Sequence, residues 1–277
     1  MRKIALLAAA AMLLVACSSG ESAPTGQAEE VEEVTPVVIQ ATEFEFLMPE
    51  ELPAGESSFR FENVGGQPHF FEVVQVQDDV TDAQVEEALR SQGEPEWLVG
   101  SADGFGLLTP GQVATATATY EPGTYVFLCF MPDTEGKEHA ALGMWNRVTV
   151  TGESPSGTEA PAADVTVEVG SDGWTLPDIS GLGGEVTFAV SGTGKSQKHS
   201  FEIGRLVDES LQPSDVGPAF EEWIGGGYQG PIPLDILGGF FSIQPDRTRY
   251  LTVTLDPGAY LFHDEANQEA DQLVTIG

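Results

Sequence analysis

The chain of 277 residues is poor in cysteine, histidine and basic residues. Two cysteines and four histidines sharply limit the metal chemistry that these side chains can support. Lysine and arginine together number 11 against 44 acidic residues, which gives a formal net charge of −33. Such a surface repels phosphate backbones, so nucleic acid is not expected as a partner. A basic protein partner or a salty environment fits this charge better.

Hydrophobic residues make up 41% of the chain, enough to build a core, and this excludes wholesale disorder. Glycine (32) and proline (18) are abundant, which favours turn-rich β structure over helical bundles. The length predicts one large or two ordinary domains.

The N-terminus has the pattern of an export signal. Arg2 and Lys3 precede the apolar run Ile4–Val15, which is too short for an ordinary transmembrane helix. The run ends in Leu14-Val15-Ala16-Cys17, which resembles the lipobox of bacterial lipoproteins. We therefore expect residues 1–16 to be a signal peptide and Cys17 to carry the lipid that anchors the chain on the extracytoplasmic side of a membrane. The alternative is an ordinary secretory signal in which Cys17 is incidental.

Two stretches rich in Ser, Gly, Glu, Ala, Pro and Thr divide the rest of the chain. Residues 17–35 are predicted to be an acidic flexible tether, and residues 152–163 a linker. We therefore expect two domains of similar size, at residues 36–151 and 164–277.

The first of these segments alternates short β runs with turn residues, which is typical of an antiparallel sandwich. One helix is expected at Asp82–Ser91, with Thr81 or Asp82 as its cap. The predicted strands are Val37–Phe46, Ser58–Glu62, Phe70–Val76, Ala114–Tyr120, Thr124–Phe130 and Arg147–Val150.

The second segment repeats this layout, with a short helix near Val216–Trp223. Residues 120–127 (YEPGTYVF) match residues 255–262 (LDPGAYLF) at an offset of 135 residues. Upstream, residues 68–73 (PHFFEV) correspond to residues 198–203 (KHSFEI). This pattern indicates a tandem duplication of one β domain.

Metal-ligating side chains concentrate in the first segment. Cys129 is the only thiol outside the predicted anchor, and an exported protein meets an oxidising compartment in which an exposed free thiol is a liability. His139 and Met144 follow it in the order Cys, His, Met, and His69 lies upstream. Two imidazoles, a thiolate and a thioether are the ligands of a type 1 copper site. The alternative is that Cys129 is a buried, inert residue.

Segment 36–151 resembles a cupredoxin of the plastocyanin and azurin superfamily. The stretch Gly123–Cys129 (GTYVFLC) matches that family's lead-in to its copper cysteine, and Pro68-His69 matches its upstream ligand. The resemblance implies a Greek-key β-sandwich and a single copper bound by His69, Cys129, His139 and Met144. It further implies that the whole chain is all-β, with two tandem cupredoxin-like domains that each carry a short helix insertion.

One departure from that family concerns the loop between the late ligands. Nine residues separate Cys129 from His139, whereas plastocyanins and azurins have two to four, although copper nitrite reductases have a comparably long loop. Three alternatives follow: His139 as a solvated loop residue, Met144 as a core residue, and Met131 as a rival thioether.

The second segment has Asp264 at the position that corresponds to Cys129, and no methionine follows it. His199 and His263 could join Asp264 in holding zinc or Cu(II). We instead expect the second segment to be a degenerate copy without metal, which serves as a packing, docking or spacer domain.

Catalysis is not expected. Two-domain cupredoxin enzymes bind further copper through several histidines, often in His-x-His pairs, and this chain has no such pair. Leu128 stands where those enzymes place a histidine directly before the copper cysteine. The chain also lacks a Gly-x-Ser-x-Gly elbow and a His-Glu-x-x-His motif.

These features predict outer-sphere electron transfer through one copper. Ala140, Ala141 and Leu142 would surround an exposed edge of His139 and form a small docking patch. The acidic surface would steer a basic redox partner such as a cytochrome. Two alternatives stay open: a lipoprotein that carries or buffers copper, and a metal-free scaffold for binding or assembly in the envelope.

Overall fold

A computed structural model describes residues 35–91, 95–152 and 160–277. This part of the chain is mostly β-sheet, as the composition predicts. The first segment (residues 35–152) contains β1 Val37–Ala41, β2 Phe46–Leu47, β3 Glu51–Pro53, β4 Gly55–Asn63, β5 His69–Val76, α1 Asp82–Ser91, β6 Leu98–Leu108, β7 Val113–Tyr120, β8 Gly123–Leu128, the 3-10 turn η1 His139–Leu142 and β9 Trp145–Thr151. The second segment (residues 160–277) contains β10 Val165–Val169, β11 Gly184–Gly192, η2 Ser196–Lys198, β12 Phe201–Leu206, α2 Pro213–Gly225, β13 Leu234–Phe240, β14 Thr248–Leu255, β15 Gly258–His263, η3 Gln268–Ala270 and β16 Gln272–Ile276.

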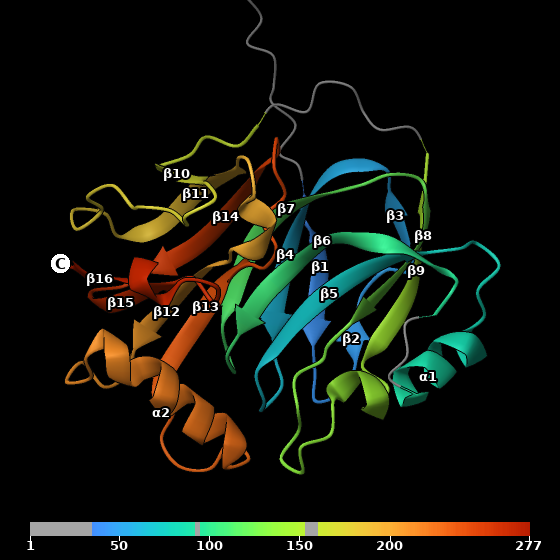
Figure 1. The fold of residues 1–277 in the computed structure, drawn as a ribbon, viewed down its shortest axis with the longest axis horizontal. Coiled ribbons are helices and arrows are strands. Elements are labelled where there is room, and N and C mark those ends of the chain that lie inside the picture. Colours follow the sequence, from blue (N-terminus) through green and yellow to red (C-terminus); the bar gives the residue numbers. More distant parts are fainter. Residues whose placement is uncertain (1–34, 92–94, 153–159) are drawn as a thin grey trace, which may run out of the picture. The chain divides into compact units, whose positions relative to one another are not determined.

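Both segments contribute strands to each of two sheets. The seven-stranded sheet has the order β10-β11-β14-β7-β4-β1-β2, and the nine-stranded sheet has the order β16-β15-β12-β13-β6-β5-β8-β9-β3. In Figure 1 the green strands β6 and β7 of the first segment lie beside the orange and red strands β13 and β14 of the second. The two segments therefore fall within one compact unit.

The strands that join the segments pair antiparallel. In the β7–β14 pair, Ala116 lies opposite Leu251, the residue 135 positions later in the chain. The other join runs through β6 and β13, where Leu108 lies opposite Leu237 and the amide of Thr109 donates to the carbonyl of Ile236 at 3.1 Å.

A buried arginine of the second segment, Arg249, donates hydrogen bonds to the first segment near this join. Arg249 Nε donates to the Thr117 carbonyl at 2.9 Å, and its Nη2 donates to the Gly104 carbonyl at 2.7 Å. Its guanidinium carbon lies 4.0 Å from the centre of the Phe240 ring. These contacts compensate a charge that would be costly to bury alone.

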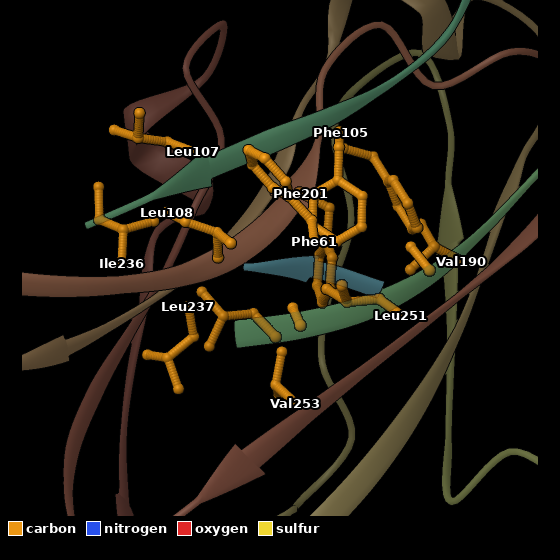
Figure 2. Packing of buried hydrophobic residues seen from close by; sticks show 14 of the residues in the cluster. Phe61, Phe105, Leu107, Leu108, Val190, Phe201, Ile236, Leu237, Leu251 and Val253 are labelled. Carbon is orange, nitrogen blue, oxygen red and sulfur yellow. The ribbon is translucent and has the colours of Figure 1, made fainter. Parts of the chain in front are cut away.

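Strand burial follows the period of two that sheets impose. In β10, Val165, Val167 and Val169 are buried, while Thr166 and Glu168 between them are exposed. The inward side chains of both segments form one continuous cluster. Figure 2 shows part of this cluster, with residues from the first segment (Phe61, Phe105, Leu107 and Leu108) packed with residues from the second (Val190, Phe201, Ile236, Leu237, Leu251 and Val253).

The helix predicted at Asp82–Ser91 is confirmed with the same bounds. At its start, the amides of Gln84 and Val85 donate to the Thr81 carbonyl, and the Thr81 hydroxyl donates to Gln84 Oε1 at 2.8 Å. Thr81 is therefore the capping residue. The second predicted helix exists and extends further than expected, over Pro213–Gly225.

Three strand predictions were wrong in detail. The expected strand Val37–Phe46 is interrupted, because the amide of Thr42 bonds the Glu45 carbonyl at 2.9 Å and turns the chain. The long strand β6 was not predicted, because glycine and serine interrupt the apolar alternation typical of a strand. The pairing is also not purely antiparallel, because β1–β4, β3–β9 and β10–β11 are parallel pairs.

Candidate metal centre

The predicted ligands come together at the end of strands β5 and β8. His69 is the first residue of β5, and Cys129 follows the last residue of β8. These two strands pair antiparallel, with Glu72 opposite Leu128, so the start of one lies beside the end of the other. His139 opens η1, and Met144 lies between η1 and β9.

Three of the ligand atoms converge in the interior. His69 Nδ1 lies 3.1 Å from His139 Nδ1, and Cys129 Sγ lies 3.9 Å from the first and 3.6 Å from the second. The side chains of all three, and that of Met144, are 0% exposed. The interpretation of His139 as a solvated loop residue is therefore wrong.

Backbone hydrogen bonds hold the late ligands to one another. The amide of His139 donates to the Met131 carbonyl at 2.8 Å, and the amide of Ala140 donates to the Cys129 carbonyl at 2.7 Å. Met144 accepts from the Cys129 amide at 3.2 Å and donates to the His139 carbonyl at 2.9 Å. Met131, the rival thioether, is buried too.

The nine residues between Cys129 and His139 form a closed hairpin. Pro132 and Glu138 make an antiparallel bridge, and the amide of Asp133 donates to the Lys137 carbonyl at 2.7 Å. Asp133 Oδ1 in turn accepts the amides of Glu135 and Lys137 at 2.8 and 2.7 Å. The long insertion thus leaves and returns at neighbouring points, and does not separate the ligands.

Two residues that the sequence analysis did not assign to the site fix His139. Gln67 Oε1 lies 3.0 Å from His139 Nε2 and accepts a hydrogen bond from it, which leaves the Nδ1 lone pair facing the other ligands. The Phe44 ring packs edge-on against the imidazole with centroids 5.2 Å apart. Phe44 lies in the turn that interrupts the expected first strand. The expected exposed edge of His139 is therefore covered, which corrects the docking prediction in that respect.

Asn63 supports the turn that carries Gln67. Its Nδ2 donates to the carbonyls of Gln67 and Leu108 at 2.8 and 2.9 Å, and its Oδ1 accepts the amide of Gly65 at 3.0 Å. A side chain at Gly65 would press against the Thr42 carbonyl and approach His69 Nε2. Glycine at this position therefore lets the turn approach the imidazole closely.

Burial keeps the site neutral when no metal is bound. Desolvation, reinforced by the neighbouring His139, lowers the pKa of His69 to about 3. Desolvation likewise lowers the pKa of His139 to about 4, against the raising effect of Asp133 and Glu43. Burial raises the pKa of the Cys129 thiol to about 11, although the amides of Phe70 and Met131 donate to it. Both imidazoles therefore offer lone pairs at neutral pH, and the thiol needs a cation in order to ionise.

The polar atoms of this cluster are not satisfied by the protein alone. His69 Nε2 is buried and has no hydrogen-bond partner among the described residues, while its Nδ1 faces the Nδ1 of His139. Whichever nitrogen of His69 carries the proton, a buried polar group is left without a proper partner, which is costly. A cation that accepts both Nδ1 lone pairs and the thiolate relieves the contact between the two Nδ1 atoms, although the Nε2–H of His69 is still without a partner among the described residues.

The donor set selects among metals. Two imidazoles and one thiolate with a methionine close by suit a type 1 copper, whereas zinc sites take Cys, His, Asp or Glu. His69, Cys129, His139 and Met144 form a buried site that fits one type 1 copper.

The corresponding place in the second segment is closed by hydrogen bonds. His199 Nδ1 lies 2.6 Å from Asp264 Oδ2, and its Nε2 lies 3.1 Å from the Ser171 carbonyl. Asp264 Oδ1 accepts the Ser200 amide at 3.1 Å. His263 bonds a different partner, with its Nδ1 3.0 Å from Asp271 Oδ1. The two histidines thus face separate carboxylates.

A cleft of about 660 Å³ lies between α1 and the ligand loop. The three predicted docking residues line it: Ala140 is buried, and Ala141 and Leu142 are half-buried. Charged residues of both signs, Glu86, Arg90, Glu135, Lys137 and Glu138, also line it.

The predicted lipid site, Cys17, and the predicted signal and tether lie outside the described residues. Within the described part of the chain, no helix is long and apolar enough to cross a membrane.

A scan of protein-family models and a search of curated proteins found no match. Among solved structures, the chain is similar to the dithionite-reduced auracyanin of the photosynthetic bacterium Roseiflexus castenholzii, with 29% identity over 43% of this chain and 98% of that one, at a TM-score of 0.31. It is also similar to auracyanin A of Chloroflexus aurantiacus, described as a "blue" copper protein, with 23% identity over 42% of this chain and 98% of that one, at a TM-score of 0.30. The copper assignment rests on the ligand geometry above.

Proposed function

We propose that the chain is an exported, lipid-anchored electron carrier with one type 1 copper in its first segment. The observation that carries this proposal is the convergence of His69 Nδ1, His139 Nδ1 and Cys129 Sγ in a fully buried pocket. The finer architecture belongs to the same proposal: two tandem Greek-key sandwiches, of which residues 36–151 hold the metal and residues 164–277 do not. The pairing of Ala116 with its counterpart Leu251 supports the duplication.

Each ligand has a distinct role in this proposal. Cys129 would supply the thiolate, His69 and His139 the two imidazoles, and Met144 a weaker thioether donor. Bound copper would supply one-electron chemistry by cycling between the +1 and +2 states. Gln67 and Phe44 hold His139 in one orientation, and the backbone bonds between Cys129, His139 and Met144 keep the ligands from moving. A site that does not rearrange is suited to electron transfer.

Burial supports an electron carrier over the alternative of a copper carrier or buffer. A protein that hands copper to a partner needs ligands that the partner can reach, and here all four are fully enclosed. The metal-free scaffold alternative leaves the convergence of two imidazole Nδ1 atoms and a thiol unexplained.

The cleft lined by Ala140, Ala141 and Leu142 is the proposed docking surface. It lies directly beside the loop of His139 and combines apolar and charged groups. The net charge of −33 would attract a basic partner, such as a c-type cytochrome, and salt would weaken this attraction.

The test uses copper-loaded protein reduced with ascorbate and mixed rapidly with a basic ferricytochrome c. We expect a single electron to transfer from each chain, with a rate that falls as salt increases and with copper retained afterwards. Rapid loss of copper to a chelator, together with slow reduction, would contradict electron transfer and favour a copper carrier.

A further inference from the structure

The second segment reaches across to the loop that carries the ligands. The hydroxyl of Tyr228 donates a hydrogen bond to the carbonyl of Pro132, three residues after Cys129. Tyr228 follows the C-terminal end of α2 and is half-buried. A residue of the metal-free segment is thus bonded to the hairpin between Cys129 and His139.

The backbone of this contact is unusual. Gly227 has φ 73°, and Tyr228 has φ 60°, a left-handed conformation that residues with a bulky side chain rarely adopt. The turn is held by the amide of Gly227 on the Ile224 carbonyl at 2.9 Å and by the amide of Tyr228 on the Trp223 carbonyl at 3.0 Å. Such strained residues persist where the surrounding structure holds them in place.

Packing holds the phenol ring on its far side. The ring of Trp223, which is 8% exposed, meets that of Tyr228 edge-on with centroids 5.2 Å apart. Gly227 lies against the hairpin as well, since a Cβ at this position would come within 3.1 Å of the Thr134 carbonyl. The end of α2 therefore touches the hairpin at two points, Pro132 and Thr134.

The phenol of Tyr228 is affected by groups of the metal site and of the hairpin. The pKa of Tyr228 is raised above its ordinary value, first by burial and then by electrostatic interaction with Cys129 and Asp133. The hydroxyl therefore remains a hydrogen-bond donor, and its bond to Pro132 persists over the working range of pH.

We propose that Tyr228 is a positioning residue for the copper site, through which the second segment fixes the long loop between Cys129 and His139. The inference rests on the proposed function, and it gives the second segment a role: the nine-residue loop is longer than its ligands require, and α2 supports it from outside. Loss of the hydroxyl frees the Pro132 carbonyl and loosens the hairpin. The distance between the thiolate and the imidazole of His139 then varies.

The test compares Tyr228→Phe with Tyr260→Phe in the whole chain. Tyr260 is a matched control, because its hydroxyl also donates to a backbone carbonyl, that of Asp256 at 2.8 Å, within the second segment. In copper-free protein, we expect the amides of Asp133, Lys137 and His139 to exchange hydrogen about tenfold faster in Tyr228→Phe alone. In copper-loaded protein, we expect a changed thiolate-to-copper absorption ratio, a shifted reduction potential and copper loss to a chelator about tenfold faster.

A second variant guards against a simple folding defect. Gly227→Ala keeps the hydroxyl but forces a Cβ toward Thr134, and it should shift the same absorption ratio and potential. If Tyr228→Phe and Gly227→Ala match wild type and Tyr260→Phe in both potential and hairpin exchange, the positioning role is wrong while the copper function stands. If wild-type protein binds no copper, the proposed function fails and the positioning role fails with it.

Discussion

Each segment places a histidine beside one other polar side chain, at positions that correspond in the sequence. The two pairs differ in their hydrogen bonding. In the first segment, His69 Nδ1 lies 3.9 Å from Cys129 Sγ, and its other nitrogen has no partner among the described residues. In the second, His199 Nδ1 lies 2.6 Å from Asp264 Oδ2, and its other nitrogen meets the Ser171 carbonyl. Both pairs are buried. The imidazole and thiol groups that converge in the first segment are suited to bind a cation, whereas the paired groups of the second segment stabilise the fold.

The residues at positions 129 and 264 differ in the partners that they suit. A thiolate at position 129 is a soft ligand for copper, whereas the carboxylate at position 264 accepts hydrogen bonds from a histidine and from two backbone amides. The surrounding aromatic core is similar in kind, with Phe71 and Phe127 packed together in one segment and Phe201 and Phe262 in the other.

The largest expected effect comes from replacing Cys129 and its counterpart Asp264, each by serine. Cys129→Ser should abolish the thiolate-to-copper absorption completely, because a hydroxyl does not replace a thiolate as a soft ligand. Asp264→Ser should leave that absorption unchanged per folded molecule. Copper titrations followed by visible absorption measure both. A Cys129→Ser protein that keeps the band would show that Cys129 is not the thiolate ligand.

Stability should respond in the opposite order. Asp264→Ala leaves His199 buried with half of its bonding lost, and breaking a buried pair in this way costs about 3–5 kcal/mol of unfolding free energy. Cys129→Ala in copper-free protein removes one small buried group and should cost about 1–2 kcal/mol. Urea unfolding without copper compares the two variants. A cost for Asp264→Ala no greater than that for Cys129→Ala would show that the second pair is not a stabilising element.

The partner of His139 offers a finer test. Gln67→Leu removes the acceptor of the His139 Nε2 proton, so the imidazole is no longer held in one tautomer and orientation. We expect copper affinity to fall about 10- to 100-fold, as is typical when a residue that orients a ligand is lost. Competition with a chelator measures this change. Gln77→Leu, at an exposed position of the same segment, is the control, and an equal affinity in both variants would contradict a role for Gln67.

The last test compares the corresponding glutamates Glu72 and Glu202, each three residues after its histidine. Glu202 is half-buried with its Oε1 enclosed, and burial raises its pKa to about 7, against the lowering effect of His263 and of the Leu107 amide. The unfolded chain loses this proton near pH 4.5, so stability should fall as pH rises from about 4.5 to about 7, by up to about 3 kcal/mol.

Urea unfolding at several pH values checks this dependence. Glu202→Gln should flatten it strongly, and Glu72→Gln should flatten it less, because burial also raises the pKa of Glu72, which is the more exposed counterpart in the first segment. If the two variants show the same dependence, the contribution of Glu202 is wrong.

Local patterns predicted much of the fold and most of the site. The alternation of apolar residues located four of the six proposed strands to within two residues at each end and a fifth to within three, and helix α1 followed from its cap and its apolar face. The ligand set followed from residue types and their order. These features depend on short stretches of sequence, so they can be read without the fold.

Contacts between distant residues were not predictable in the same way. Nothing local marks Phe44 or Gln67 as neighbours of His139, because the first reaches it through a turn that breaks a strand and the second through a side-chain bond across 72 residues. The burial of His139 and the contact of Tyr228 with Pro132 likewise depend on how distant elements pack. The strand β6 was not predicted because glycine is unfavourable within strands. The fold explains these glycines, since they let β6 approach the backbones of Phe71 and Gly239 closely.

The proposed function depends above all on the binding of one copper through Cys129 in the first segment. The most direct test is the visible absorption spectrum of the chain from residue 18 onward, after addition of Cu(II). The account predicts an intense thiolate-to-copper charge-transfer band that saturates at one copper per chain and is bleached by ascorbate. The absence of such a band, with the Cys129 thiol still free when the protein is unfolded and titrated, would contradict it.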